Sequence, residues 1–141
     1  GIARRAWWLA TVIGALVAWF LGSLPSTLIS MQAEAGATPV QEPSTAVVLL
    51  LAAALGALAG PILAVPQWFV LRRHVVRAGR WIQVHSLAWA LGMPIIFAGI
   101  DVAQRTASFA LVLSVMAVTL ALAGAVVGTV HGTMLVRMAE E

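Results

Sequence analysis

Charged residues divide the chain into long uncharged intervals. No Asp, Glu or Arg occurs between residues 6 and 33, and three more such intervals follow at 43–71, 81–100 and 106–136. Each interval matches or exceeds the roughly 20 apolar residues that cross the hydrocarbon core of a bilayer. The pattern therefore predicts one transmembrane domain over residues 1–141, with four helices near residues 6–30, 46–72, 81–100 and 106–137.

The composition supports the same fold class, an all-α integral membrane four-helix bundle. Of the 141 residues, 62% are hydrophobic and only 9% are charged, whereas an average soluble domain carries roughly 25% charged residues. The chain also has no cysteine, which excludes a disulfide scaffold, a thiolate metal site and a cysteine nucleophile. What the composition predicts is a chain surrounded by lipid.

The arginines predict the orientation. Seven of the eight basic residues fall on one side of the predicted spans, and only Arg105 falls on the other. The positive-inside rule then places both termini and the link between the second and third helices in the cytoplasm of a bacterial inner membrane. Near this side lie four tryptophans that we interpret as an aromatic belt: Trp7, Trp8, Trp68 and Trp81. Trp19 and Trp89 lie deeper and are expected to pack between helices.

The second and fourth predicted helices align without a gap. Residues 60–73 match residues 124–137 at an offset of 64, with glycine, leucine and arginine identical at three positions. In this alignment His131 takes the place of Gln67. The repeat predicts two tandem helix hairpins in parallel orientation.

Small residues recur four apart in every predicted helix. Because lipid gives helices no hydrophobic reason to associate, close backbone approach across small faces favours packing. Packing inside one bundle is the simplest interpretation, and a groove for another subunit's helix, a pigment or a haem is the alternative. The glycines assigned to helix packing are Gly14, Gly22, Gly56, Gly60, Gly92, Gly124, Gly128 and Gly132.

Four polar residues lie at nearly one depth within the predicted spans. Thr11, Gln67, His85 and His131 are each five or six residues from an arginine, so at 1.5 Å per residue they lie roughly 7–9 Å inside the basic side. One interpretation is an interhelical hydrogen-bond layer. The alternative is cofactor binding, with haem b held between His85 and His131 as axial ligands or a (bacterio)chlorophyll held by either.

The link between the second and third spans concentrates positive charge. Four arginines are expected to contact lipid headgroups, or alternatively an acidic partner surface: Arg72, Arg73, Arg77 and Arg80. The high pI of 11.5 reflects scarce acids and no basic domain outside the bilayer, so a nucleic-acid partner is disfavoured.

A motif after the glycine-rich second helix carries a resemblance. Gln67-Trp68-x-x-Leu71-Arg72-Arg73, followed by Arg77-Ala-Gly-x-Trp81 and later by 124–137, resembles a group of small bacterial four-span membrane proteins with a Gln-Trp-x-x-Leu-Arg motif. Pro66 and His131 depart from the pattern of the group. The resemblance implies a four-span architecture and no particular activity.

Intramembrane chemistry has few candidate residues. No charged residue lies in the middle of any predicted span and the chain has no lysine, which disfavours ion-coupled transport, Schiff-base chemistry and intramembrane proteolysis. We therefore expect no enzyme and no soluble substrate. The predicted function is an accessory or scaffold subunit of a larger energy-transducing, photosynthetic, respiratory or transport complex, binding membrane lipids and neighbouring transmembrane subunits. The alternative is a haem b or (bacterio)chlorophyll protein.

Overall fold

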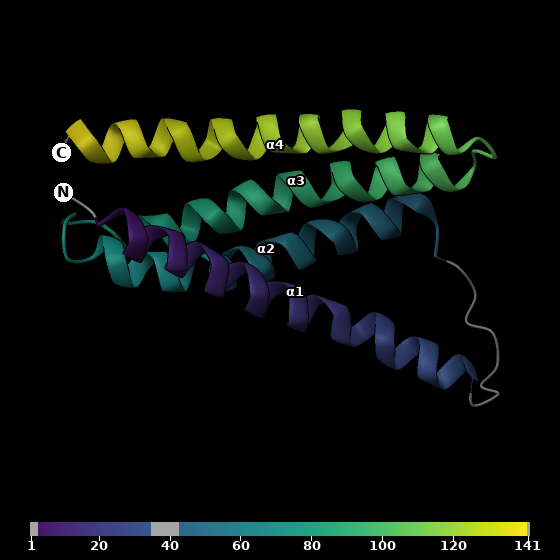
Figure 1. Cartoon of the computed structure of the whole chain (residues 1–141), viewed down its shortest axis with the longest axis horizontal. Helices are drawn as coiled ribbons and strands as arrows, with labels where there is room; N and C mark the ends of the chain where they lie inside the picture. The colour runs from purple at the N-terminus through teal and green to yellow at the C-terminus, as the bar shows by residue number, and fades with distance from the viewer. Residues whose placement is uncertain (1–2, 35–42, 141) are drawn as a thin grey trace.

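Four α-helices make up the computed structural model, which describes residues 3–34 and 43–140 (Figure 1). They are α1 (Arg4–Glu34), α2 (Thr45–Leu71), α3 (Arg80–Gln104) and α4 (Phe109–Glu140). The described residues contain no β-strand. The all-α fold class is therefore confirmed, with four helices in the predicted order.

The predicted bounds of the third and fourth helices need correction. The third helix continues beyond residue 100 to Gln104, and the fourth begins at Phe109 instead of 106. An Arg105 guanidinium nitrogen donates to both carboxylate oxygens of Asp101, at 3.0 Å each. A helix brings residues four apart together, so this pair keeps the charged turn helical. Hydrogen bonding to Asp101 and its negative charge raise the pKa of Arg105 above the ordinary value.

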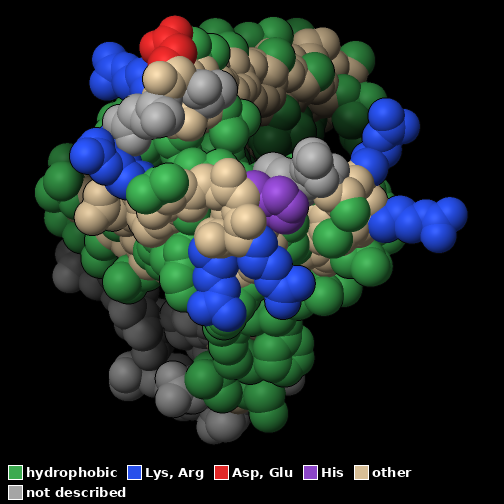
Figure 2. All heavy atoms as spheres, turned by 90° about the vertical axis from the view of Figure 1, so that its left-hand side faces the viewer, with side chains coloured by type: hydrophobic (Ala, Val, Ile, Leu, Met, Phe, Trp, Pro, Cys, Tyr) green, Lys and Arg blue, Asp and Glu red, His purple; other side chains and the backbone are tan. Residues whose placement is uncertain are grey.

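All four helices are long and apolar enough to cross a membrane. The spanning segments are Arg4–Leu24, Thr45–Leu71, Arg80–Gln104 and Phe109–Met138, with mean hydropathy between 1.6 and 2.5. The chain is a multi-pass membrane protein. Both chain ends and the link between α2 and α3 lie at one end of the molecule (Figure 1), and basic side chains surround that face (Figure 2). We call it the arginine end.

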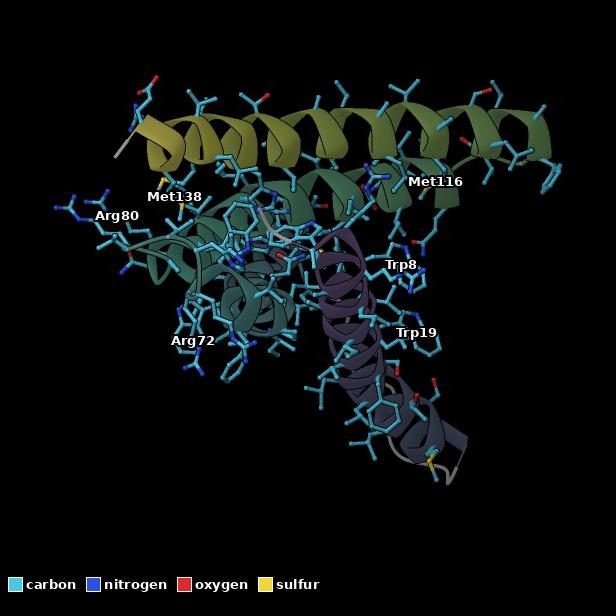
Figure 3. All side chains as sticks on the ribbon, turned by 60° about the vertical axis from the view of Figure 1, so that its left-hand side comes forward. Trp8, Trp19, Arg72, Arg80, Met116 and Met138 are labelled. Atoms are coloured by element: carbon cyan, nitrogen blue, oxygen red, sulfur yellow. The ribbon has the colours of Figure 1, made fainter. Side chains whose placement is uncertain are left out.

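The helices pack in chain order. α1 packs on α2, α2 on α3 and α3 on α4, and no described Cα atom of α1 comes within 8 Å of one in α4. Away from the arginine end α1 and α4 diverge (Figures 1 and 3). At the arginine end the bundle has its core, which consists of Ala64, Leu71, Ala78, Trp81 and Met138.

α2 and α3 have the most extensive contact, and two glycines of α2 allow it. A Cβ atom on Gly60 would lie 2.7 Å from the Cα of Ser86 and would overlap the backbone carbonyl of His85. A Cβ on Gly56 would overlap the carbonyl of Trp89. These are backbone atoms that cannot rotate aside, so only glycine permits this approach. The tightest interface of the molecule thus lies between the two predicted hairpins.

A proline in α2 also contributes to this interface. Pro61 has no N–H, so it leaves the carbonyl of Ala57 without its usual helical donor. The hydroxyl of Ser86, in α3, donates to that carbonyl at 2.7 Å. Because the hydrocarbon region offers no water to a free carbonyl, a hydroxyl on the next helix fills the gap.

Glycines at the other two interfaces differ in tightness. A Cβ on Gly14 would lie 2.6 Å from the carbonyl oxygen of Leu63, so α1 also approaches the backbone of α2. Between α3 and α4 the contact is looser, since a Cβ on Gly92 would meet a side-chain methyl of Val127 at 2.7 Å. α4 therefore packs on α3 through side chains.

Four of the glycines predicted to pack between helices contact no other helix within the described chain. A Cβ added to any of them would meet no atom within 4 Å: Gly22, Gly124, Gly128 and Gly132. In α4 the buried positions are Thr119, Ala123 and Met138 instead. α4 is rotated so that its glycines point away from α3, and the aligned pair Gly60 and Gly124 therefore have opposite environments.

Two of the tryptophan predictions are wrong. The sequence predicts Trp81 in the interfacial belt, yet it is only 3% exposed and lies in the core. Trp19 was expected between helices, yet it is 74% exposed and projects from α1 (Figure 3). Among the described helices α1 packs lengthwise on α2 alone and reaches α3 only near its start, through Trp7, so the Trp19 ring is left uncovered.

Candidate functional site

A hydrogen-bond chain links the first three helices near the arginine end. Gln67, buried in α2, donates from Nε2 to the hydroxyl of Thr11 in α1 at 2.9 Å. Its Oε1 accepts a bond from the indole Nε1 of Trp81 in α3 at 2.8 Å. The Thr11 hydroxyl in turn donates to the carbonyl of Trp7 at 3.0 Å. One amide side chain thus bonds two neighbouring helices with both of its polar atoms.

Trp81 is the residue that sequence reasoning missed. Its position beside Arg80 suggested a ring at the membrane interface. The signal that could have placed it is helical spacing, because Trp81, His85 and Ala88 are four and seven residues apart and so share one face. All three are buried. Trp81 lies between Gln67 on one side and the histidines on the other.

The two histidines meet across the α3–α4 interface. The ring centroids of His85 and His131 are 4.0 Å apart, with 31° between the ring planes. The Trp81 ring lies 4.7 Å from His85 and 5.2 Å from His131, and Trp7 adds a fourth ring 5.8 Å from Trp81. Residues from all four helices therefore meet in one cluster of rings and amides, which we call the polar-aromatic cluster.

The hydrogen bonding of the two imidazoles differs. Nδ1 of His85 is 3.2 Å from the carbonyl of Trp81, and since a carbonyl only accepts, this contact assigns a proton to Nδ1. His131 has a buried Nε2 with no hydrogen-bond partner. A buried polar atom without a hydrogen-bond partner costs about 1–3 kcal/mol. Burial of Nε2 of His131 therefore reduces the stability of the cluster.

The geometry does not fit haem or chlorophyll ligation. A haem with two histidine ligands lies between the two imidazole rings, but rings with centroids 4.0 Å apart are in contact, since carbon atoms touch at roughly 3.5–4.0 Å. A chlorophyll ligand needs a ring nitrogen open to a flat macrocycle, whereas Nε2 of His131 is buried and His85 is 4% exposed. What the arrangement does fit is an interhelical contact layer.

The side chains that could bind a metal ion do not gather in the described residues. The described residues contain no group of three or more His, Cys, Asp or Glu side chains that could hold a metal ion.

The arginines of the link have different surroundings. Arg72 places its guanidinium over the rings of Trp68 and Phe69, 5.0 and 4.7 Å from their centroids. Such cation–π contacts fix the group at the height of the ring. Arg73 and Arg77 are exposed, while Arg80 is partly buried at the first residue of α3.

The Gln-Trp-x-x-Leu-Arg motif divides between two faces of α2. Gln67 and Leu71, four apart, are buried, whereas Trp68 is half-buried beside the core and exposed Arg72 stacks on its ring. No family model, curated protein or solved structure matches the chain. The function must therefore be inferred from the geometry.

Proposed function

We propose that the chain is a scaffold subunit of a larger assembly in a bacterial inner membrane, and that α4 binds a transmembrane helix of another subunit. The observation that carries the proposal is the outward face of α4. Between residues 110 and 132, every residue on this face is both small and exposed: Ala110, Ser114, Ala117, Ala121, Gly124, Gly128 and Gly132.

The face is continuous and faces away from α3. At about 100° per residue these seven positions fall within a sector of roughly 80°, on the side of α4 opposite the buried Thr119 and Ala123. Residues 110–132 extend roughly 33 Å along the axis, which is about the full hydrocarbon thickness. α4 therefore offers a flat strip across the whole membrane.

Lipid contact alone does not explain such a strip. α1 presents large apolar side chains to its surroundings, including Leu16, Trp19 and Phe20, all well exposed. Small residues on a membrane helix instead let another helix approach closely, because van der Waals packing and backbone proximity drive association there. The strip on α4 supports a helix-binding role, and α3, which is the one described helix that packs along α4, leaves the strip uncovered.

The orientation part of the proposal follows from charge. The positive-inside rule assigns the arginine end to the cytoplasm, with both termini there. Arg105 alone would lie on the opposite side.

Substitution of an outward glycine tests the proposal. Gly128→Leu should abolish co-purification of the partner helix in mild detergent, because the leucine side chain blocks close approach. Gly22→Leu is the matched control, since Gly22 is another open glycine with no atom near its Cβ position. The chain also lacks cysteine, so a single cysteine at Ala121 should cross-link to the partner in native membranes.

Two results would overturn the proposal. One is a lone 14.8 kDa chain in mild detergent together with no cross-link from position 121. The other is equal loss of the partner in the Gly22 and Gly128 variants.

A further inference from the structure

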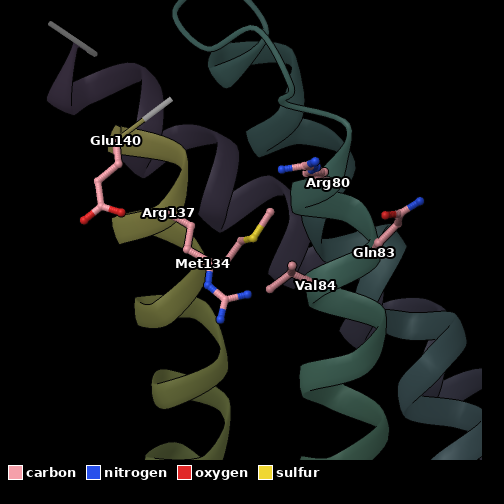
Figure 4. A pocket seen from close by; sticks show the side chains of 6 residues that line it. All are labelled: Arg80, Gln83, Val84, Met134, Arg137 and Glu140. Carbon is pink, nitrogen blue, oxygen red and sulfur yellow. The ribbon is translucent and has the colours of Figure 1, made fainter.

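A second surface feature is a cavity between α3 and α4 at the arginine end. An open cavity of about 540 Å³ lies between the first turns of α3 and the last turns of α4 (Figure 4). Its lining residues are Arg80, Gln83, Val84, Met134, Arg137 and Glu140. The polar-aromatic cluster and the outward face of α4 contribute none of them.

Two guanidinium groups reach this cavity from different helices. Arg80 extends from α3 toward α4, and Arg137 lies on α4 beside the gap between the two helices (Figure 4). The Glu140 carboxylate also lines the cavity but is directed away from α3 (Figure 4). The cavity lining therefore carries a net charge of +1 at neutral pH, from two arginines and one glutamate.

The first backbone N–H groups of α3 already donate hydrogen bonds within the chain. The N–H of Arg80 bonds to the carbonyl of Arg77 at 3.0 Å, and those of Trp81 and Ile82 bond to the two carbonyls that follow Arg77. A ligand of this cavity would therefore be held by side chains. Guanidinium groups suit phosphate in particular, because their planar N–H pairs match two phosphate oxygens.

The inner wall of the cavity is apolar. Val84 lies one helical turn beyond Arg80, and Met134 lies about one turn before Arg137, so both sit deeper in the membrane than the two arginines. Their side chains occupy the gap between α3 and α4 (Figure 4). A free anion has no use for such a wall, whereas a phospholipid presents a phosphate and an acyl chain in this order of depth.

We infer that Arg80 and Arg137 bind the phosphate of an anionic phospholipid. The part of an acyl chain nearest the headgroup then lies against Val84 and Met134. Basic pockets between transmembrane helices are a known means of holding anionic headgroups. Of the four link arginines only Arg80 lines this cavity, and Arg72 is instead stacked on aromatic rings. The inference is independent of the proposed partner helix on α4.

Lipid titration followed by native mass spectrometry tests the inference. The purified chain in detergent is titrated with phosphatidylglycerol, and with phosphatidylcholine of the same acyl chains as the neutral headgroup control. The double variant Arg80→Gln with Arg137→Gln should bind phosphatidylglycerol roughly tenfold more weakly, since it loses two guanidinium contacts. Phosphatidylcholine binding should remain weak and unchanged.

A matched double variant controls for charge. Arg72→Gln with Arg73→Gln removes the same two charges at the same end of the molecule and should change phosphatidylglycerol affinity by less than about twofold. Equal weakening in the two double variants would overturn the inference, because the attraction would then be diffuse. Glu140→Gln should strengthen binding, which keeps the test decisive if the arginine variants fold poorly; unchanged or weaker binding there would count against the site.

Inorganic phosphate distinguishes the lipid from a free anion. A large excess of phosphate should leave most phosphatidylglycerol bound, because phosphate gains nothing from Val84 and Met134. Full displacement would show a small-anion site and overturn the lipid assignment.

Discussion

α2 and α4 carry the same pattern of small residues in opposite environments. Gly56 and Gly60 in α2 and Gly124 and Gly128 in α4 are each spaced four apart. The glycines of α2 face the backbone of α3, where a Cβ atom would overlap it, whereas those of α4 face no atom within 4 Å. A ladder of small residues thus marks a face suited to close contact without specifying the partner.

The difference arises from position in the bundle. Among the described helices α2 has a neighbour on each side, α1 and α3, while α4 packs lengthwise on α3 alone. Its side toward α3 packs through Thr119, Ala123 and Met138, so its glycines are left for contacts outside the chain. α2 therefore holds this chain together, whereas the role that we propose for α4 is to join the chain to another subunit.

The polar residues of the two helices repeat the contrast. Gln67 and His131 occupy equivalent positions in the aligned repeat, and both lie in the polar-aromatic cluster. Gln67 bonds two other helices through both of its polar atoms, while Nε2 of His131 is buried without a partner. The two aligned residues therefore lie at the same level of the bundle, but only Gln67 has hydrogen bonds that stabilise the contacts between helices.

The largest expected effect comes from filling one glycine of each ladder. Gly60→Leu should destabilise the isolated chain by about 3 kcal/mol or more, because the new side chain would overlap the backbone of α3. Gly128→Leu should change stability by less than about 0.5 kcal/mol, since its surroundings are open. Unfolding by sodium dodecyl sulfate, followed by circular dichroism, measures both. Similar losses in the two variants would contradict the difference between the ladders.

The spans could be predicted because charge is costly in a bilayer, so the uncharged intervals fix where helices cross it. A common level along the bundle could be predicted for Thr11, Gln67, His85 and His131 too, because the rise per residue is fixed. The four do meet in one region of the structure, although through Trp81, which sequence reasoning had assigned to the membrane interface.

The rotation of each helix about its own axis could not be predicted. The few polar residues of α4 are spread around the helix, so no polar face indicates which side meets α3, and its glycines favour the opposite side. Trp81 poses the same problem, since a tryptophan beside an arginine suits an interface belt or a buried hydrogen bond equally well. The acceptor that decides the matter, Oε1 of Gln67, is 14 residues away and on another helix.

A smaller effect separates the two aligned polar residues. Gln67→Leu should destabilise the chain by about 1–3 kcal/mol, because it removes two interhelical bonds and leaves the Trp81 indole N–H unpaired. His131→Leu should stay within about 1 kcal/mol of the parent, since relief of the unpaired Nε2 offsets the lost ring contacts. Unfolding by sodium dodecyl sulfate, followed by circular dichroism, measures both variants. A greater loss in His131→Leu than in Gln67→Leu would show that His131 has a partner.

The smallest effect concerns two serines, one at the α2–α3 contact and one on the outward face of α4. Ser86→Ala should cost about 1 kcal/mol, because the Ala57 carbonyl, already deprived of a donor by Pro61, would have none in the membrane. Ser114 donates to Ala110 within its own helix at 2.9 Å, and that carbonyl keeps its position in the helical ladder, so Ser114→Ala should be neutral within about 0.3 kcal/mol. Hydrogen exchange at the α2 amides before Pro61 gives a second readout, which should rise only in Ser86→Ala. Equal changes in stability and hydrogen exchange in the two variants would contradict this prediction. The interhelical bond of Ser86 would then stabilise the chain no more than the bond of Ser114 within its own helix.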